Sequence, residues 1–240
     1  MPVGGRYREV DIARGVAVVL MVVFHFAWDL DHFGLVDADM LNGPWYWFGR
    51  LIGSLFIFIL GLSMQLAVER KPAAFAFYMR RGAGLLALGA AVSLGTWFVL
   101  PDGYVVFGIL SLLGVLCLLL YPLRRLPPLP LACAGIAMIA IGFPLNAVYT
   151  ETPWLLWLGV LEQGRYMADW YPLLPWGGFG LLGIAAGKRI YGLGRPLLVP
   201  HVPAGIGERS LKFLGRHPLI IYLVHQPVLV AMFWLLGFRA

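Results

Sequence analysis

Long apolar runs separated by short polar stretches are the main pattern of this chain, and they predict an all-α protein that crosses a membrane about seven times. A helix needs roughly 17–25 apolar residues to cross a bilayer, and seven runs reach that length. At 240 residues the chain is expected to form a single domain over residues 1–240, and no internal repeat or soluble linker is visible. The expected spans are Asp11–Trp28, Trp45–Val68, Gly82–Leu100, Tyr104–Leu123, Leu129–Val148, Leu173–Tyr191 and Leu219–Phe238.

Shorter patterns before the sixth expected span predict surface roles. The run WLLWLGV at 154–160 is too short to cross a bilayer and is expected to be interfacial or re-entrant. Trp170, Tyr171 and Trp176 favour an aromatic belt at the membrane surface.

Glycines inside the sixth expected span predict close helix packing. Gly183 and Gly187 have the GxxxG spacing that lets membrane helices approach each other. The overlapping Gly178-x-Gly180-x-x-Gly183 has the spacing of a dinucleotide-binding motif, but no strand precedes it, so that function is rejected.

The composition agrees with a membrane protein. The chain is 60% hydrophobic and only 12% charged, with a mean hydropathy of +0.82, so lipid is the expected solvent for most of it. Cys117 and Cys133 lie in apolar runs and indicate nothing about disulfides, metal binding or redox compartment. The five histidines have no metal-ligand spacing, and we expect no metal.

The distribution of basic residues predicts the topology. With the N-terminus in the cytoplasm, fifteen of the eighteen basic residues fall on the cytoplasmic side, which is the positive-inside pattern. The net charge of +6 then reflects topology, and nucleic acid is not an expected partner. These fifteen are Arg6, Arg8, Arg14, Arg70, Lys71, Arg80, Arg81, Arg124, Arg125, Lys188, Arg189, Arg195, Arg209, Lys212 and Arg216.

The first expected span carries ionisable residues along one face. Eleven residues bring a helix back to within about 20° of the same direction, so Arg14 and His25 share a face, about 16 Å apart. Asp11 and Asp29 lie near the same face. Ionisable groups inside a bilayer are costly and usually functional. The alternatives are that Arg14 only anchors the topology and that His25 only bonds a neighbouring helix.

The last expected span carries a second histidine within an apolar run. His225 is followed by Gln226 and by Pro227, which frees a backbone carbonyl and favours a kinked helix lining a cavity. A kink with a hydrogen-bonded histidine is the alternative. If the first and last helices meet, His25 and His225 form one site.

Charged residues on the predicted outer side suggest further contacts. Arg50 opens the second span one turn before Ser54, and we expect it to pair with an outer carboxylate such as Asp29 or Asp169.

Several of these segments, in this order, resemble a known family of membrane acyltransferases. Arg14, ten residues and His25, together with LGLS near the end of the second span, are similar to the acyltransferase type 3 family. VDIARGVAVVLMVV and SLFIFILGLSMQ resemble more closely the related bacterial family grouped with heparan-alpha-glucosaminide N-acetyltransferase. VVFGILSLLGVLCLLL, DWYPLLPWGGFGLLGIAAG and HPLIIYLVHQPVL are similar to its later segments. The lysosomal members differ in carrying an asparagine at the position of His25.

The resemblance implies transfer of an acetyl group from cytoplasmic acetyl-CoA to a saccharide-type acceptor, a glycan or glycolipid, on the outer side of a bacterial plasma membrane. Arg14, with Arg80 or Arg81, would hold the CoA phosphates. His25 would deprotonate the acceptor or carry the acyl group, with Asp29 orienting it. His225 would bind the thioester oxygen or the acceptor. Asp11, Arg50 and Asp169 complete the candidate substrate-binding residues, and membrane lipid and a second copy of the chain are expected partners.

Two other functions fit the same pattern. The Arg14–His25–Asp29 stripe would serve as the proton relay of a small proton-coupled transporter, although no inverted repeat is visible. A non-catalytic membrane partner of another enzyme is the other alternative.

The charge distribution gives a direct test of the topology. In a chain with Cys117 and Cys133 replaced by serine, Arg80→Cys should react with a membrane-impermeant thiol reagent only from the cytoplasmic side. Asp37→Cys should react only from outside. Labelling of both positions from one side of intact cells would contradict the predicted orientation.

Overall fold

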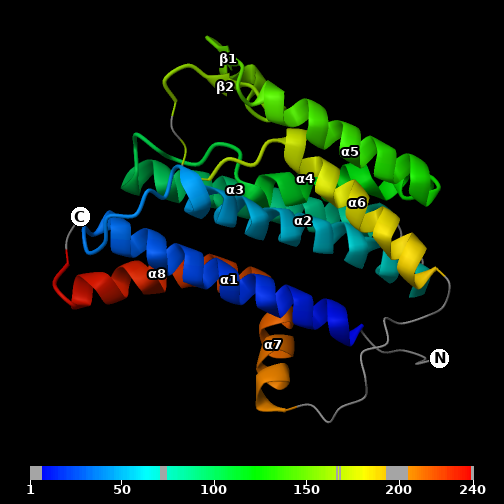
Figure 1. The fold of residues 1–240 in the computed structure, drawn as a ribbon, viewed down its shortest axis with the longest axis horizontal. Helices are drawn as coiled ribbons and strands as arrows, with labels where there is room; N and C mark the ends of the chain where they lie inside the picture. Colours follow the sequence, from blue (N-terminus) through cyan, green and yellow to red (C-terminus); the bar gives the residue numbers. More distant parts are fainter. Residues whose placement is uncertain (1–6, 71–74, 166, 168, 193–204, 239–240) are drawn as a thin grey trace. The chain divides into compact units, whose positions relative to one another are not determined.

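The structure, a computed structural model, consists almost entirely of helices over the residues that it describes, which are 7–70, 75–165, 167, 169–192 and 205–238 (Figure 1). Each of the seven expected spans contains a helix, although α4 begins only at Ile109, and a further described helix, α7, was not predicted. The helices are α1 (Arg8–His32), α2 (Gly43–Arg70), α3 (Phe75–Val99), α4 (Ile109–Leu123), α5 (Pro128–Leu145), α6 (Leu173–Tyr191), α7 (Ile206–Arg216) and α8 (Pro218–Leu235).

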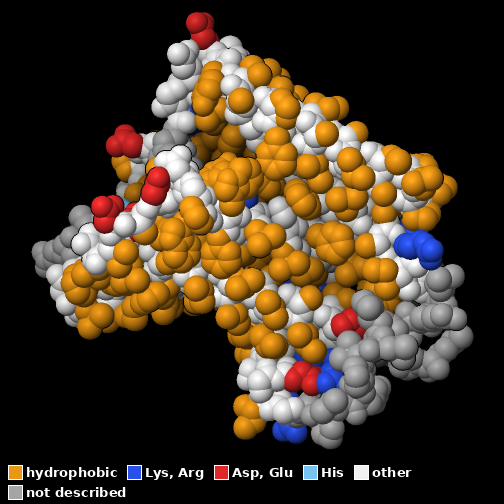
Figure 2. Space-filling view, in the orientation of Figure 1, with side chains coloured by type: hydrophobic (Ala, Val, Ile, Leu, Met, Phe, Trp, Pro, Cys, Tyr) orange, Lys and Arg blue, Asp and Glu red, His pale blue; other side chains and the backbone are white. Residues whose placement is uncertain are grey.

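The prediction of an all-α polytopic membrane protein is confirmed. Among the described helices, α1, α2, α3, α5 and α8 are long and apolar enough to cross a membrane. Helix α4 is apolar but has 15 residues, and α6 is rich in glycine and ends in Lys188 and Arg189. In Figure 2, hydrophobic side chains cover the visible faces of the long helices, and charged atoms gather around α7.

The chain divides into two compact units. The first combines Met1–Phe56 with Pro196–Ala240, and the second is Ile57–Arg195. The single domain over residues 1–240 stays a prediction. Four basic residues of the charge argument lie outside the described residues: Arg6, Lys71, Arg195 and Arg239.

In the first unit, α8 runs alongside α1, and α7 crosses the N-terminal end of α1 at a steep angle (Figure 1). Two glycines permit this crossing. A Cβ on Gly15 would collide with the backbone of Leu211, and a Cβ on Gly215 would collide with the carbonyl of Asp11. The sequence therefore brings the two backbones into contact, and with them the side chains on either side of the crossing.

Helix α1 has one exposed face and one buried face. Val16, Val19, Val23 and Phe26 recur at helical spacing and are exposed, as expected for a lipid-facing stripe. On the other face the buried residues are Val10, Asp11, Gly15, Ala17, Val18, Met21 and Asp29. The two carboxylates of the predicted polar stripe are thus directed into the protein.

In the second unit, glycines set the spacing between helices. Gly183 of α6 lies against the backbone of Phe58 in α2, and Gly178 of α6 lies against the backbone of Gly135 in α5. The prediction that Gly183 packs closely against another helix is confirmed, and the same holds for Gly187, which contacts the side chain of Gln65.

The segment between α5 and α6, residues 146–172, folds locally. Two-residue strands β1 (Tyr149–Thr150) and β2 (Leu161–Glu162) pair in parallel on either side of a 3₁₀ turn, η1 (Pro153–Leu155). Trp170 donates from Nε1 to the carbonyl of Leu156.

The aromatic-belt interpretation of this region is wrong. Trp170, Tyr171 and Trp176 are buried inside the second unit, where Trp176 is only 3% exposed. Hydropathy places such residues near a membrane surface but does not show which neighbours cover them, and here Tyr171 and Phe179 pack on the ring of Trp176.

The close approach at Gly183 can be tested by a single methyl group. Gly183→Ala should lower the free energy of unfolding by about 1–3 kcal/mol, because the new Cβ meets the backbone of Phe58 and the helices must separate. Gly84→Ala is the matched control, since a Cβ there meets nothing within 4 Å. Thermal unfolding of the purified variants measures the difference, and equal stability would contradict the packing.

Candidate functional site

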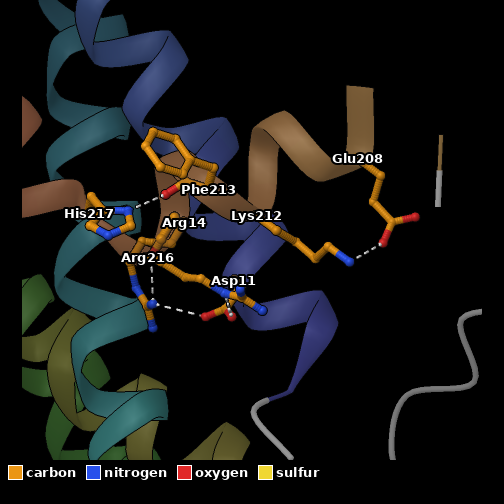
Figure 3. A network of polar contacts seen from close by, with 8 residues as sticks. Asp11, Arg14, Glu208, Lys212, Phe213, Arg216 and His217 are labelled. Atoms are coloured by element: carbon orange, nitrogen blue, oxygen red, sulfur yellow. Dashed lines mark hydrogen bonds and ion pairs between the residues drawn. The ribbon is translucent and has the colours of Figure 1, made fainter. Parts of the chain in front are cut away.

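Asp11 joins two arginines where α7 crosses α1 (Figure 3). Its Oδ1 accepts from Nη1 of Arg14 at 3.2 Å, and its Oδ2 accepts from Nε of Arg216 at 3.3 Å. Arg14 also donates to the backbone carbonyl of Gly215 at 2.8 Å. Asp11 is 4% exposed, so its charge is buried against the two guanidinium groups.

A second carboxylate lies on α7 near the first. Glu208 pairs with Arg8 of α1 and, at 3.1 Å, with Lys212 one turn along α7. Desolvation acts to raise the pKa of Glu208, but the hydrogen bonds and charges of Arg8 and Lys212 outweigh it and lower that pKa. Glu208 is therefore ionised at neutral pH.

We call these six residues the basic cluster: Arg8, Asp11, Arg14, Glu208, Lys212 and Arg216. Two carboxylates neutralise only part of the charge of four basic side chains, so the cluster keeps a positive excess. The N-terminus of α1 adds its partial positive charge. Such an arrangement favours an anion, and two planar guanidinium groups suit phosphate oxygens.

Two histidine rings meet between α1 and α8. The ring centroids of His25 and His225 are 4.6 Å apart, and the planes cross at 78°. The first and last helices therefore bring these two side chains together, and their common functional role stays a prediction.

Each ring is held by its own helix. Nδ1 of His25 lies 2.9 Å from the carbonyl oxygen of Met21, and Nδ1 of His225 lies 2.7 Å from that of Tyr222. A carbonyl can only accept, so in the neutral rings Nδ1 carries the proton and Nε2 presents a lone pair. Nε2 of His225 is buried and has no hydrogen-bond partner among the described residues.

Asp29 is bonded to the last helix and not to His25. Its Oδ1 accepts from Nε2 of Gln226 at 2.6 Å. Asp29 is 1% exposed, and its second oxygen has no partner in the described part of the chain. The expected orienting bond from Asp29 to His25 is absent from this geometry, because the imidazole donates to its own helix.

The remaining predicted site residues lie elsewhere. The guanidinium of Arg50 lies over the ring of Tyr46, 5.0 Å from its centroid, and its pairing with an outer carboxylate stays a prediction. Asp169 accepts from the backbone N–H of Ile109 at 3.0 Å, which caps the start of α4. Arg80 and Arg81 are exposed on α3, in the second unit, and their part in a common site with Arg14 stays a prediction.

Sequence reasoning did not assign site roles to the residues of α7 or to Gln226. Arg216, Lys212 and Glu208 lie in a polar stretch that no apolar run marks, and their partners Asp11 and Arg8 are about 200 positions away. The signal that was available is the pattern of α7 itself, in which basic residues share a short helix with Leu211 and Gly215.

No group of three or more His, Cys, Asp or Glu residues within the described ranges could hold a metal ion.

Comparison with known proteins gives one result. No curated protein and no solved structure matches the chain significantly. A family model described as "Heparan-alpha-glucosaminide N-acetyltransferase, catalytic" matches residues 6–227, which includes both the basic cluster and the histidine pair. The chain belongs to the heparan-alpha-glucosaminide N-acetyltransferase catalytic family, a family of membrane acetyltransferases.

Proposed function

We propose that this protein is a membrane-embedded acyltransferase that moves an acetyl group from cytoplasmic acetyl-CoA to a saccharide-type acceptor on the outer side. The observation that carries the proposal is the order of groups along α1. An anion-binding cluster lies at one end, and a pair of histidines with available lone pairs lies about 16 Å along the same helix.

The basic cluster is suited to the phosphates of CoA. Arg14 and Arg216 are held side by side by Asp11, so their donors are arranged before a ligand arrives. Asp11 acts here as a positioning residue, because a carboxylate repels phosphate but fixes the two arginines. An acetyl-CoA held by these arginines would direct its acyl end along α1 towards His25.

The histidine pair is suited to proton transfer. We assign His25 as the general base that accepts the proton of the acceptor's hydroxyl or amine at Nε2 while the new bond to the acetyl carbon forms. The carbon–sulfur bond of the thioester breaks, and the proton passes from His25 to the sulfur. CoA then leaves as the thiol, and no proton is gained or lost overall when the acceptor is neutral.

Family membership and the charge pattern support other features of the proposal. The family's description supports an acetyl donor and a saccharide-type acceptor. The positive-inside pattern supports a cytoplasmic basic cluster, and the resemblance supports a bacterial plasma membrane.

Binding of the donor tests the role of Arg14. Arg14→Ala should weaken acetyl-CoA binding by about tenfold to a hundredfold, because one charge-assisted hydrogen-bonding partner is lost. Arg14→Lys should restore only part of it, since an ammonium lacks the planar fork. Arg125→Ala, which removes an exposed basic residue after α4, is the matched control. Equilibrium titration of the purified proteins gives the constants, and unchanged binding by a folded Arg14→Ala would reduce Arg14 to a topology anchor.

Transfer of label from [acetyl-³H]acetyl-CoA to membrane glycans tests the role of His25 and the function as a whole. His25→Gln should lower the rate by about 10²–10⁴-fold if His25 is the general base, while acetyl-CoA still binds. His217→Gln is the control, because His217 makes the same kind of bond to a carbonyl, that of Phe213, but is exposed. Normal transfer by His25→Gln would remove this role. Uptake driven by a pH gradient, without any transfer, would favour the transporter.

A further inference from the structure

Three hydrogen-bond acceptors lie unpartnered at one level of the first unit. They are Oδ2 of Asp29, Oε1 of Gln226 and Nε2 of His225, and each is buried with no partner among the described residues. Asp29 is 1% exposed and His225 is 9% exposed, so water from the surface has little access to them. Buried polar groups in folded proteins are nearly always bonded, and an unbonded group is costly.

The three atoms belong to residues that contact one another. Gln226 donates to Asp29, and His225 precedes Gln226 on α8 and lies against His25. His25 and Asp29 are one turn apart on α1. All four residues come from the same unit and from two adjacent helices, and these contacts link the three acceptor-bearing side chains to the proposed general base.

All three atoms are hydrogen-bond acceptors. A carboxylate oxygen and an amide oxygen can only accept hydrogen bonds, and Nε2 of His225 accepts because Nδ1 already donates to carbonyl oxygens. A group that donates several hydrogen bonds would satisfy them. A carbonyl, a phosphate or the thioester would not, because each of these also accepts.

We infer that Asp29, Gln226 and His225 form the subsite that binds the nucleophilic end of the acyl acceptor, where the reacting hydroxyl or amine and neighbouring hydroxyls of the sugar donate hydrogen bonds to them. This inference rests on the proposed function. Gln226 is a positioning residue in this subsite, because its amide holds one oxygen of Asp29 and leaves the other directed to the ligand. The subsite lies next to His25, which removes a proton from the same group.

The inference predicts that the empty subsite destabilises the protein. If Asp29 and Gln226 served only packing, they would stabilise the folded protein. Because each has an unsatisfied acceptor, the two residues instead lower the free energy of unfolding until a ligand binds. The double variant Asp29→Leu/Gln226→Met replaces both side chains by apolar ones of similar size. Its Tm without ligand should exceed that of the wild type by about 2–4 °C.

Ligand binding is measured on the same full-length proteins in nanodiscs, as the rise in Tm caused by each probe. Methyl α-D-glucosaminide offers an amine and hydroxyls, and methyl α-D-glucoside offers hydroxyls alone. The wild type should be stabilised by the glucosaminide. Stabilisation by both probes identifies hydroxyl recognition, and stabilisation by the glucosaminide alone identifies the amine. The double variant should lose these shifts.

Controls separate this inference from the proposed function. Acetyl-CoA should stabilise the double variant as it stabilises the wild type, because the basic cluster is untouched. Asp29→Asn, which keeps the size of the side chain but replaces an acceptor by a donor, should weaken probe binding by about tenfold to a hundredfold. Val228→Leu, at an exposed position of the same helix, should change neither property.

The outcomes are decisive in both directions. The subsite is overturned if the double variant has a lower Tm than the wild type, or if Asp29→Asn keeps the probe shifts. It is also overturned if neither probe shifts the Tm of the wild type, because water alone would then satisfy the acceptors. If the wild type does not bind acetyl-CoA, the proposed donor is wrong, but the probe shifts remain evidence for the subsite.

Discussion

The low dielectric of a membrane is the constraint on which the first unit depends. Charged and polar side chains between apolar helices are tolerated only when they face one another, and α1 buries two carboxylates, Asp11 and Asp29, on its inner face. The charge of Asp11 is compensated by two arginines, and Asp29 accepts a hydrogen bond from Gln226. The contacts that join α1 to α7 and α8 fit this requirement, because Asp11 has a partner on α7 and Asp29 has one on α8.

Glycine contacts make these partnerships possible. Salt bridges and hydrogen bonds act over about 3 Å, so the backbones that carry them must come close. The crossing of α1 and α7 at Gly15 and Gly215 does this for Asp11 and Arg216. In the second unit, close contacts at glycines also join α6 to α2 and α5, and no charged residue takes part in these contacts. Packing and chemistry are thus separated between the two units.

How much of the structure the sequence predicts depends on how far apart in the chain the interacting residues lie. Run length found the helices from α1 to α6 and α8, and the eleven-residue spacing put Arg14, His25 and the carboxylates on one face. Both rest on local periodicity. The partners of Asp11 and Asp29 could not be found, because Arg216 and Gln226 lie 205 and 197 positions away and nothing local marks them. The same limit explains the aromatic residues before α6, whose burial depends on neighbours distant in sequence.

The hydrogen bond between Asp29 and Gln226 can form only after most of the chain has been synthesised. These residues are separated by 197 positions, and a ribosome adds about 5–20 residues per second, so α1 waits about 10–40 s for its partner. Throughout that interval α1 carries Asp29 without Gln226, the side chain that later donates a hydrogen bond to it, and His25 without the ring of His225. The completion of α8 ends that exposure of polar groups on the nascent helix.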